Sequence, residues 1–206
     1  MNIKLHDGSV VELQDGLNAL DAAKQIDQAL YKAALACEIN GEPCSLVTAL
    51  KDGDTLKICT WEDELGRWTL RHTASHVLAQ AVMALFPDVK LAIGPAIDTG
   101  FYYDFDKETP FSAEDLTKIE AEMKKIVKED LPLEKRVITV EEGREIFAGQ
   151  TYKLELLEEY AEKGWELTVY KQGDFTDLCA GPHLMSTGAI KAVKLTKVAA
   201  AYWRGD

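Results

Sequence analysis

The sequence predicts an α+β protein in two parts: a small module of short strands around one helix, and a larger domain whose helices pack on an antiparallel sheet. Three observations support this fold class. Segments with the two-residue alternation of strands occur in both halves of the 206-residue chain. Segments with the 3.6-residue periodicity of helices lie between them. Apolar residues make up 47% of the chain and charged residues 28%, which is typical of soluble domains with packed cores.

Alternation and turn dipeptides mark the first strands of the small module. Residues 3–5 and 11–13 alternate between apolar and polar side chains on either side of Asp7-Gly8, a hairpin turn signal. One helix follows the capping candidate Asn18 and continues to Leu30, with its apolar residues on or near one face.

The second half of the module returns to strands. A strand-like run over residues 34–39 ends at Asn40-Gly41, and Asp52-Gly53 precedes a last strand through residues 56–58. The order strand, strand, helix, strand, strand in so short a stretch predicts a β-grasp, ubiquitin-like module. The acidic segment over residues 61–66 predicts a brief connection after it.

The larger part begins with a helix over residues 68–86, ended by Pro87. Residues 91–105 contain the glycines, aromatic residues and β-branched residues expected of strands and a turn. Ser112 is the candidate cap of an amphipathic helix. The apolar stripe of that helix consists of Leu116, Ile119, Met123, Ile126 and Val127.

The remaining pattern completes an arrangement of helices against a sheet. We expect a strand over residues 136–140 and a short helix over residues 141–147. A further helix over residues 153–163 ends at Gly164, a C-cap signal. Strands are expected at residues 167–170 and near residues 192–198.

Net charge and hydropathy argue against a nonspecific nucleic-acid binder and against a membrane protein. The net charge of −12 argues against tight, nonspecific binding to a phosphate backbone. A local positive excess near the end of the chain is a candidate RNA contact, or equally a solvated face; it consists of Lys191, Lys194, Lys197 and Arg204 against Asp206. The sequence has no apolar run long enough to span a bilayer and no signal-peptide pattern, so we expect a cytoplasmic protein without membrane contact.

The four cysteines lack the Cys-x-x-Cys spacing of common metal and redox motifs. In a cytoplasmic chain we expect reduced thiols. Three of them, Cys37, Cys44 and Cys59, are expected to pack inside the small module as small hydrophobic residues, and Cys179 lies in the larger part.

Two segments carry most of the chemically active residues. His72 and His76 are four residues apart on a predicted helix, so their imidazoles share one helical face. The segment Asp177-Leu178-Cys179-Ala180-Gly181-Pro182-His183, expected to be irregular, combines a carboxylate, a thiol and an imidazole. Brought together, the histidines and the cysteine have the ligand types of zinc, and they also suit metal-free activation of water by neutral imidazole. The structural alternative is that each histidine is only hydrogen-bonded.

Four motifs in combination resemble the bacterial threonyl-tRNA synthetases, and the resemblance covers the whole chain. The motifs are His72-x-x-x-His76; Ile93-Gly94-Pro95-Ala96-Ile97 with Gly100-Phe101-Tyr102-Tyr103-Asp104; Asp177-x-Cys179-x-Gly181-Pro182-His183; and Ala201-Tyr202-Trp203-Arg204-Gly205-Asp206. The resemblance implies that residues 1–62 form a TGS domain of the β-grasp type. It implies that residues 63–206 form an editing domain related to those of alanyl-tRNA synthetases.

The resemblance also implies a set of site residues. His72, Lys153 and Asp177 would be catalytic: His72 or Lys153 would activate or hold water, Lys153 would stabilise an oxyanion, and Asp177 would bind the amino group or hydroxyl of serine. The substrate pocket would be completed by His76, Tyr103, Cys179 and His183. No metal is implied for this reaction. Zinc held by His72, His76, Cys179 and His183 is the alternative, because the alanyl-type relatives carry it.

The implied activity is hydrolysis of the ester that joins serine to the 3′ end of threonine tRNA, which prevents misincorporation of serine. ATP, a catalytic zinc and the contacts of a homodimer would belong to an aminoacylation core, which this sequence lacks along with the anticodon-binding domain. The sequence is therefore expected to be a fragment or a free-standing editing protein. Two alternatives remain open: a catalytically silent module that binds tRNA or regulates, and a zinc-dependent hydrolase.

Overall fold

The computed structural model describes residues 1–205, and packing divides the chain into two units. The first unit comprises Met1–Thr73 together with Gly181–Met185, and the second comprises Ala74–Ala180 together with the chain from Ser186 onward. Asp206, the last residue of the motif that begins at Ala201, lies outside the described residues. Within residues 1–205, no helix has both the length and the apolar character needed to cross a membrane.

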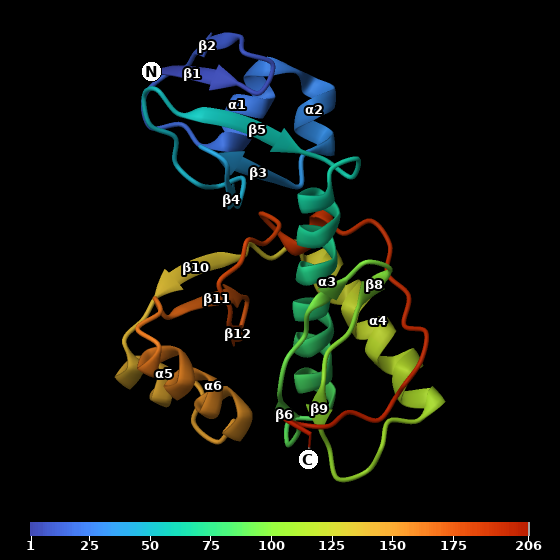
Figure 1. The fold of residues 1–206 in the computed structure, drawn as a ribbon. Helices are drawn as coiled ribbons and strands as arrows, with labels where there is room; N and C mark the ends of the chain where they lie inside the picture. The colour runs from blue at the N-terminus through green and yellow to red at the C-terminus, as the bar shows by residue number, and fades with distance from the viewer. Residues whose placement is uncertain (206) are drawn as a thin grey trace. The chain divides into compact units, whose positions relative to one another are not determined.

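The first unit contains a five-stranded mixed sheet with strand order β2-β1-β5-β3-β4 (Figure 1). Its central strands β1 and β5 run parallel, and the other pairs are antiparallel. The strands are β1 (Asn2–Leu5), β2 (Val10–Glu12), β3 (Ala36–Ile39), β4 (Glu42–Cys44) and β5 (Thr55–Cys59). This is the predicted β-grasp fold with one additional strand, β4. Pro43 lies inside β4 and hides the strand pattern in the sequence, because proline is rare in strand interiors.

The predicted helix after Asn18 is two helices in the structure. Asn18 caps α1 (Ala19–Ile26): its side chain accepts from the Asp21 amide at 2.9 Å, and Asp21 accepts from the Asn18 amide at 3.1 Å. The prediction of one continuous helix is wrong because Asp27 has an extended backbone. Its side chain accepts from the Leu30 amide at 2.8 Å and so caps α2 (Gln28–Ala33).

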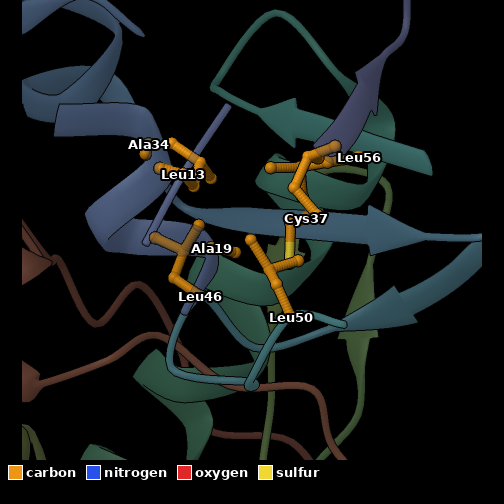
Figure 2. Packing of buried hydrophobic residues seen from close by; sticks show 9 residues of the cluster. Leu13, Ala19, Ala34, Cys37, Leu46, Leu50 and Leu56 are labelled. Carbon is orange, nitrogen blue, oxygen red and sulfur yellow. The ribbon is translucent and has the colours of Figure 1, made fainter. Parts of the chain in front are cut away.

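The core of the first unit lies between α1 and the sheet (Figure 2). Cys37 is fully buried in this core, and Cys59 is buried as well. Cys44 packs against the same cluster, as expected for small hydrophobic side chains. Burial raises the pKa of the Cys37 thiol to about 12 and that of Cys59 to about 11, because a thiolate would lose its hydration there.

The connection between β5 and the long helix α3 (Glu64–Leu85) is short and tightly hydrogen-bonded. The Thr60 amide donates to Asp63 Oδ2 at 2.9 Å, and the Asp63 amide donates back to the Thr60 carbonyl at 3.1 Å. Arg67 Nη1 donates to the carbonyls of Trp61 and Glu62, each at 2.9 Å. Because α3 already begins at Glu64, the predicted connection over residues 61–66 is shorter than its acidic composition suggests.

The second unit contains the antiparallel sheet β10-β11-β12, with helices α5 and α6 beside it (Figure 1). Apolar residues of α5, α6 and β11 form one core cluster around Leu157. The elements are β10 (Glu134–Val137), α5 (Val140–Ile146), α6 (Thr151–Glu162), β11 (Thr168–Gln172) and β12 (Phe175–Leu178). These bounds confirm the predicted helix that ends before Gly164.

The rest of the second unit combines most of α3 with the amphipathic helix α4 (Ala113–Glu129) and two short strand pairs. Ser112 caps α4 through a reciprocal pair of hydrogen bonds with Asp115, as predicted. Ile119, Met123 and Ile126 are its buried residues. The short pairs are β6 (Lys90–Leu91) with β9 (Phe105–Asp106) and β7 (Ala96–Ile97) with β8 (Gly100–Phe101).

Three predicted elements differ from the structure. Residues 192–198 form no strand, and most of their side chains are exposed, so the strand expected near these residues is absent from the structure. Val140 begins α5 instead of ending a strand, because Thr139 caps that helix with Glu142. Asp177 lies in β12, although its segment was expected to be irregular.

Gly66 is required by the tight connection. A Cβ at Gly66 would lie 1.9 Å from the Thr60 carbonyl oxygen, so Gly66→Ala forces the backbone to move. We expect a loss of about 1–3 kcal/mol of unfolding free energy, although alanine favours helices. Urea unfolding followed by circular dichroism measures the loss. Gly100→Ala is the matched control, because nothing lies within 4 Å of the added Cβ. Equal stability of the two variants would contradict the prediction.

Burial of Cys37 makes stability depend on alkaline pH. Burial raises the pKa of the folded thiol to about 12 from its ordinary value of 9.0, so the folded state keeps its proton where the unfolded chain loses it. This contribution is complete below pH 9 and falls as pH rises toward 12, by roughly 2 kcal/mol at pH 10.5. Urea unfolding under reducing conditions at pH 8 and pH 10.5 measures the change. Cys37→Ala should lose less stability than the unmodified chain between these two values, and an identical loss would refute the assignment.

Candidate functional site

The centre of the candidate site in the second unit is the carboxylate of Asp177 on β12. Pairing of β12 with β11 places Asp177 opposite Tyr170. The Asp177 residue is 1% exposed, and Lys153, in the first turn of α6, is 3% exposed. Two oppositely charged side chains are therefore buried at one place, which is unusual for Asp and Lys.

Three donors surround the Asp177 carboxylate. Lys153 Nζ lies 2.7 Å from Oδ1, and the Leu178 amide donates to the same oxygen at 2.8 Å. The Tyr103 hydroxyl donates to Oδ2 at 2.7 Å. Burying an ion pair is costly, and it is tolerated when charge-assisted hydrogen bonds satisfy the remaining lone pairs, as they do here. Such a pair adds little net stability compared with apolar packing, so its presence points to a functional role.

Tyr103 is held by packing as well as by its hydroxyl. Its ring stacks on Phe105 at a centroid distance of 4.9 Å and lies directly against Gly94. A Cβ at Gly94 would stand 2.0 Å from Tyr103 Cδ2, so only glycine leaves room for the ring. Burial, followed by the negative charge of Asp177, raises the pKa of Tyr103 well above its usual value. Tyr103 therefore remains a hydrogen-bond donor at any physiological pH.

His76 lies beside the same carboxylate. Its Nε2 is 3.7 Å from Asp177 Oδ2, an ion-pair separation that is longer than a hydrogen bond. The imidazole also meets the ring of Phe175 edge to face at 6.4 Å. His76 is 3% exposed, so it forms part of a buried wall next to the carboxylate.

The first unit holds the other two histidines of the site. The rings of His72 and His183 stack with centroids 4.3 Å apart. The ring of Trp68 also contacts His72, tilted, at a centroid distance of 4.5 Å. His183 is fully buried, and its Nδ1 lies 3.0 Å from the hydroxyl of Thr73. His72 and His76 stand one turn apart on α3, as the sequence predicted.

Cys179 directly follows β12 and is half-buried. Its backbone continues the pairing with β11: the Cys179 amide donates to the Thr168 carbonyl at 3.0 Å, and its carbonyl accepts from the Thr168 hydroxyl at 2.6 Å. This pairing fixes the strand end that carries the thiol. The imidazoles of His72, His76 and His183 and the thiol of Cys179 are donor types that zinc prefers.

The structure groups the seven predicted site residues in two sets. His76, Tyr103 and Lys153 gather around Asp177 in the second unit, with Cys179 two residues farther along the chain. His72 and His183 stack in the first unit. Sequence reasoning gave no role to Thr73 or Gly94, which support His183 and Tyr103. In the sequence, the only indication of a role for Thr73 and Gly94 was their location inside the quoted motifs. Their contacts with His183 and Tyr103 form only in the folded chain and leave no local pattern.

Two family models match this chain. Residues 1–60 match the TGS domain, which are the residues that build the β-grasp sheet. Residues 167–206 match the threonyl and alanyl tRNA synthetase second additional domain. The second match includes Asp177, Cys179 and His183.

Curated relatives match over the whole chain. A threonine–tRNA ligase of Clostridium botulinum (strain Kyoto / Type A2) is 55% identical over 208 aligned residues, covering 100% of this chain and 33% of the relative. A threonine–tRNA ligase of Clostridium tetani (strain Massachusetts / E88) is 54% identical, covering 100% of this chain and 32% of the relative. The chain thus spans about a third of the length of these relatives. Over its whole length, the chain is similar to the N-terminal third of bacterial threonine–tRNA ligases, with a TGS domain followed by a match to their second additional domain.

Proposed function

We propose that this chain hydrolyses the ester of serine mischarged onto threonine tRNA, with residues 63–206 as the editing domain and residues 1–62 as the TGS domain. The observation that carries the proposal is the buried group of Asp177, Lys153 and Tyr103 with His76 beside it. Similarity to threonine–tRNA ligases and to the additional domain supports tRNA as the partner.

A second, hydrolytic site is needed because a binding pocket distinguishes serine from threonine only weakly. Serine lacks one methyl group of threonine, and a pocket distinguishes substrates that differ by one methyl or methylene by only about 1–3 kcal/mol. An enzyme that accepts threonine therefore also attaches some serine to the tRNA. A second pocket that hydrolyses the smaller product supplies the missing discrimination.

Lys153 and Asp177 supply charge in the proposed reaction. The ammonium group of Lys153 donates to Asp177 and lies 5.3 Å from the centre of the Tyr103 ring, so its position is set from two sides. Its remaining N–H groups are suited to stabilise the oxyanion that forms when water attacks the ester, a contribution of about 3–4 kcal/mol in comparable sites. Asp177 binds the amino group or hydroxyl of the serine moiety.

His72 is the proposed group that activates water. A neutral imidazole accepts a proton near physiological pH, whereas an ammonium group paired with a carboxylate can only donate. Ring contacts with Trp68, which is tilted, and with His183, which is stacked, hold the imidazole of His72 in one orientation. In this proposal, His72 activates water and Lys153 stabilises the oxyanion by its charge, so each of the two residues has one role.

The other residues limit the size of the pocket. His76, Tyr103, Cys179 and His183 form the substrate-binding set, and His76 and His183 are almost fully buried. Rigid walls of this kind reject an extra methyl group by steric overlap, because packed interiors deform little. Threonine esterified to the tRNA is therefore spared.

Zinc-dependent hydrolysis is the second candidate. His72, His76, Cys179 and His183 have the ligand types of a zinc site, and a bound zinc ion would lower the pKa of a coordinated water. We propose the metal-free reaction, in which these side chains position and polarise water themselves. A catalytically silent module that binds tRNA remains the alternative from a different class of function.

A deacylation time course tests these candidates. With threonine tRNA charged with serine or with threonine, the chain should release serine and leave threonine attached. His72→Ala should slow serine release by roughly 10²–10⁴-fold, the usual effect of losing a general base. His6→Ala is the matched control, because His6 is an exposed residue of the TGS domain. A chelator should leave the rate unchanged.

The other outcomes separate the alternatives. Loss of activity on chelation, with one zinc per chain in elemental analysis, would establish the zinc-dependent reaction. A folded chain that binds the tRNA and hydrolyses neither ester would establish a silent binding module. Lys153→Ala with unchanged deacylation would remove Lys153 from the mechanism.

Gly94 provides a test of the Tyr103–Asp177 contact. Gly94→Ala should displace the Tyr103 ring, because the added Cβ overlaps it, and should lower the rate of serine release about tenfold or more. Tyr103→Phe keeps the ring and removes only the hydroxyl, so it should fall between Gly94→Ala and the unmodified chain. Gly100→Ala again serves as the unstrained control. Full activity of Gly94→Ala would show that Tyr103 need not contact Asp177.

A further inference from the structure

Gln150, the residue that precedes α6, does not cap this helix with its side chain. Within residues 1–205, the side-chain amide of Gln150 makes no hydrogen bond to the first turn of α6. Instead, Gln150 Oε1 accepts from the Leu91 amide of β6 at 2.8 Å. Gln150 Nε2 donates to the Val89 carbonyl at 3.4 Å. Both ends of the side-chain amide therefore tie the start of α6 to the segment that forms β6.

A second hydrogen bond joins α6 to the other strand of the same pair. The Tyr152 hydroxyl donates to Asp106 Oδ2 at 2.8 Å. Asp106 lies on β9, opposite Lys90 of β6. The start of α6 is thus held to β6 by Gln150 and to β9 by Tyr152.

The elements joined in this way carry two of the three donors to Asp177. Lys153 directly follows Tyr152 on α6, and its Nζ lies 2.7 Å from Asp177 Oδ1. Tyr103 lies two residues before β9, and its hydroxyl donates to Asp177 Oδ2 at 2.7 Å. The separation between Lys153 and Tyr103 therefore depends on how α6 is held against the β6–β9 pair.

The pairing of β6 with β9 continues to the residue next to Tyr103. The Ala92 amide donates to the Asp104 carbonyl at 3.0 Å, and the Asp104 amide donates to the Ile93 carbonyl at 2.8 Å. Tyr103 is therefore fixed to the strand that binds Gln150. A series of hydrogen bonds connects the two donors without passing through the carboxylate that they share.

We propose that Gln150 is a positioning residue, which sets the separation between Lys153 and Tyr103 by holding α6 to β6, with Tyr152 as the second tether. The effect on catalysis rests on the proposed function, whereas the tether itself does not. In the proposed reaction Asp177 also binds the serine moiety, so it no longer serves Lys153 and Tyr103 alone. The tether keeps Lys153 in place at this stage, with its N–H groups directed at the developing oxyanion.

The simpler role of Gln150 would be only to start α6, and Gln150→Asn separates the two roles. Asparagine is among the best N-cap residues, so it should start the helix at least as well as glutamine. Its side chain is one methylene shorter, so it cannot reach the Leu91 amide. Gln150→Glu keeps both the length and the acceptor oxygen. Gln28→Asn is the matched control, because Gln28 is an exposed residue at the start of α2.

Two NMR measurements on the whole chain report on the tether without any reaction. The Leu91 amide should exchange with solvent at least about tenfold faster in Gln150→Asn than in the unmodified chain or Gln28→Asn, because its acceptor is lost. The Lys153 methylene signals should lie upfield in the unmodified chain, because Nζ lies over the Tyr103 ring, 5.3 Å from its centroid. In Gln150→Asn they should move toward the values of exposed lysines. Lys153→Ala identifies these signals by their loss.

Serine release should follow the same order. The kcat of Gln150→Asn should fall roughly 10- to 100-fold, with KM changed less than about threefold, because Lys153 is present but misplaced. Tyr152→Phe removes only the second tether, so its kcat should fall about three- to tenfold. Gln150→Glu and Gln28→Asn should stay within about threefold of the unmodified chain. A role in starting α6 alone would leave kcat and the Lys153 signals unchanged in Gln150→Asn.

Three results would overturn the proposal. One is a Leu91 amide that exchanges as fast in the unmodified chain as in Gln150→Asn. Another is folded Gln150→Asn with unchanged Lys153 signals and kcat. The third is an equal loss of kcat in Gln150→Glu and Gln150→Asn, since only the glutamate keeps the acceptor.

The NMR signals also separate this proposal from the proposed function. If the Leu91 and Lys153 signals behave as expected but the unmodified chain releases no serine, the positioning by Gln150 stands and only the editing function fails. If Gln150→Asn does not fold, the Lys153 signals of Tyr152→Phe decide. Unshifted signals in Tyr152→Phe would then contradict the proposal, and shifted ones would support it.

Discussion

The second unit is organised around one carboxylate. Asp177 is buried on a sheet strand and accepts from an ammonium group, a backbone amide and a phenol within 2.8 Å. Each donor comes from a different place in the sequence, so the carboxylate fixes α6, the end of β12 and the aromatic segment before β9 with respect to one another. Removing any one partner would leave a buried charge or hydroxyl without compensation, which costs more than the contact contributes.

Much of the fold was predictable because local signals agreed with the packing. Capping residues at Asn18 and Ser112, the apolar stripe of α4 and the glycine after α6 all marked element boundaries correctly. The failures have physical causes. Asp27 breaks a continuous helical pattern by capping a second helix, and Pro43 conceals a strand. The strand expected near residues 192–198 does not form, because a strand needs a partner and strand pairing is a tertiary property.

The candidate site was predictable only in part. Spacing placed His72 and His76 on one helical face, and resemblance to a family supplied the role of Lys153, whose sequence context is that of an ordinary solvated lysine. Its burial against Asp177 depends on a contact 24 residues along the chain, which no local pattern encodes. Thr73 and Gly94 were missed for a related reason. A threonine in a helix and a glycine before a proline have common local explanations, and only the packed structure shows what each one contacts.

The hydrogen-bonded connection before α3 also sets the rotation of that helix. Thr60, Asp63 and Arg67 fix the point at which α3 begins, and each residue of an α-helix turns the next by about 100°. The direction of the Thr73 side chain therefore depends on the number of residues between β5 and Glu64, although this connection lies more than one helical turn before Thr73. Adding or deleting one residue there would swing the Thr73 hydroxyl away from His183 without altering either residue. The connection thus acts as a spacer of fixed length, which sets the angular phase of the helix in addition to joining two elements.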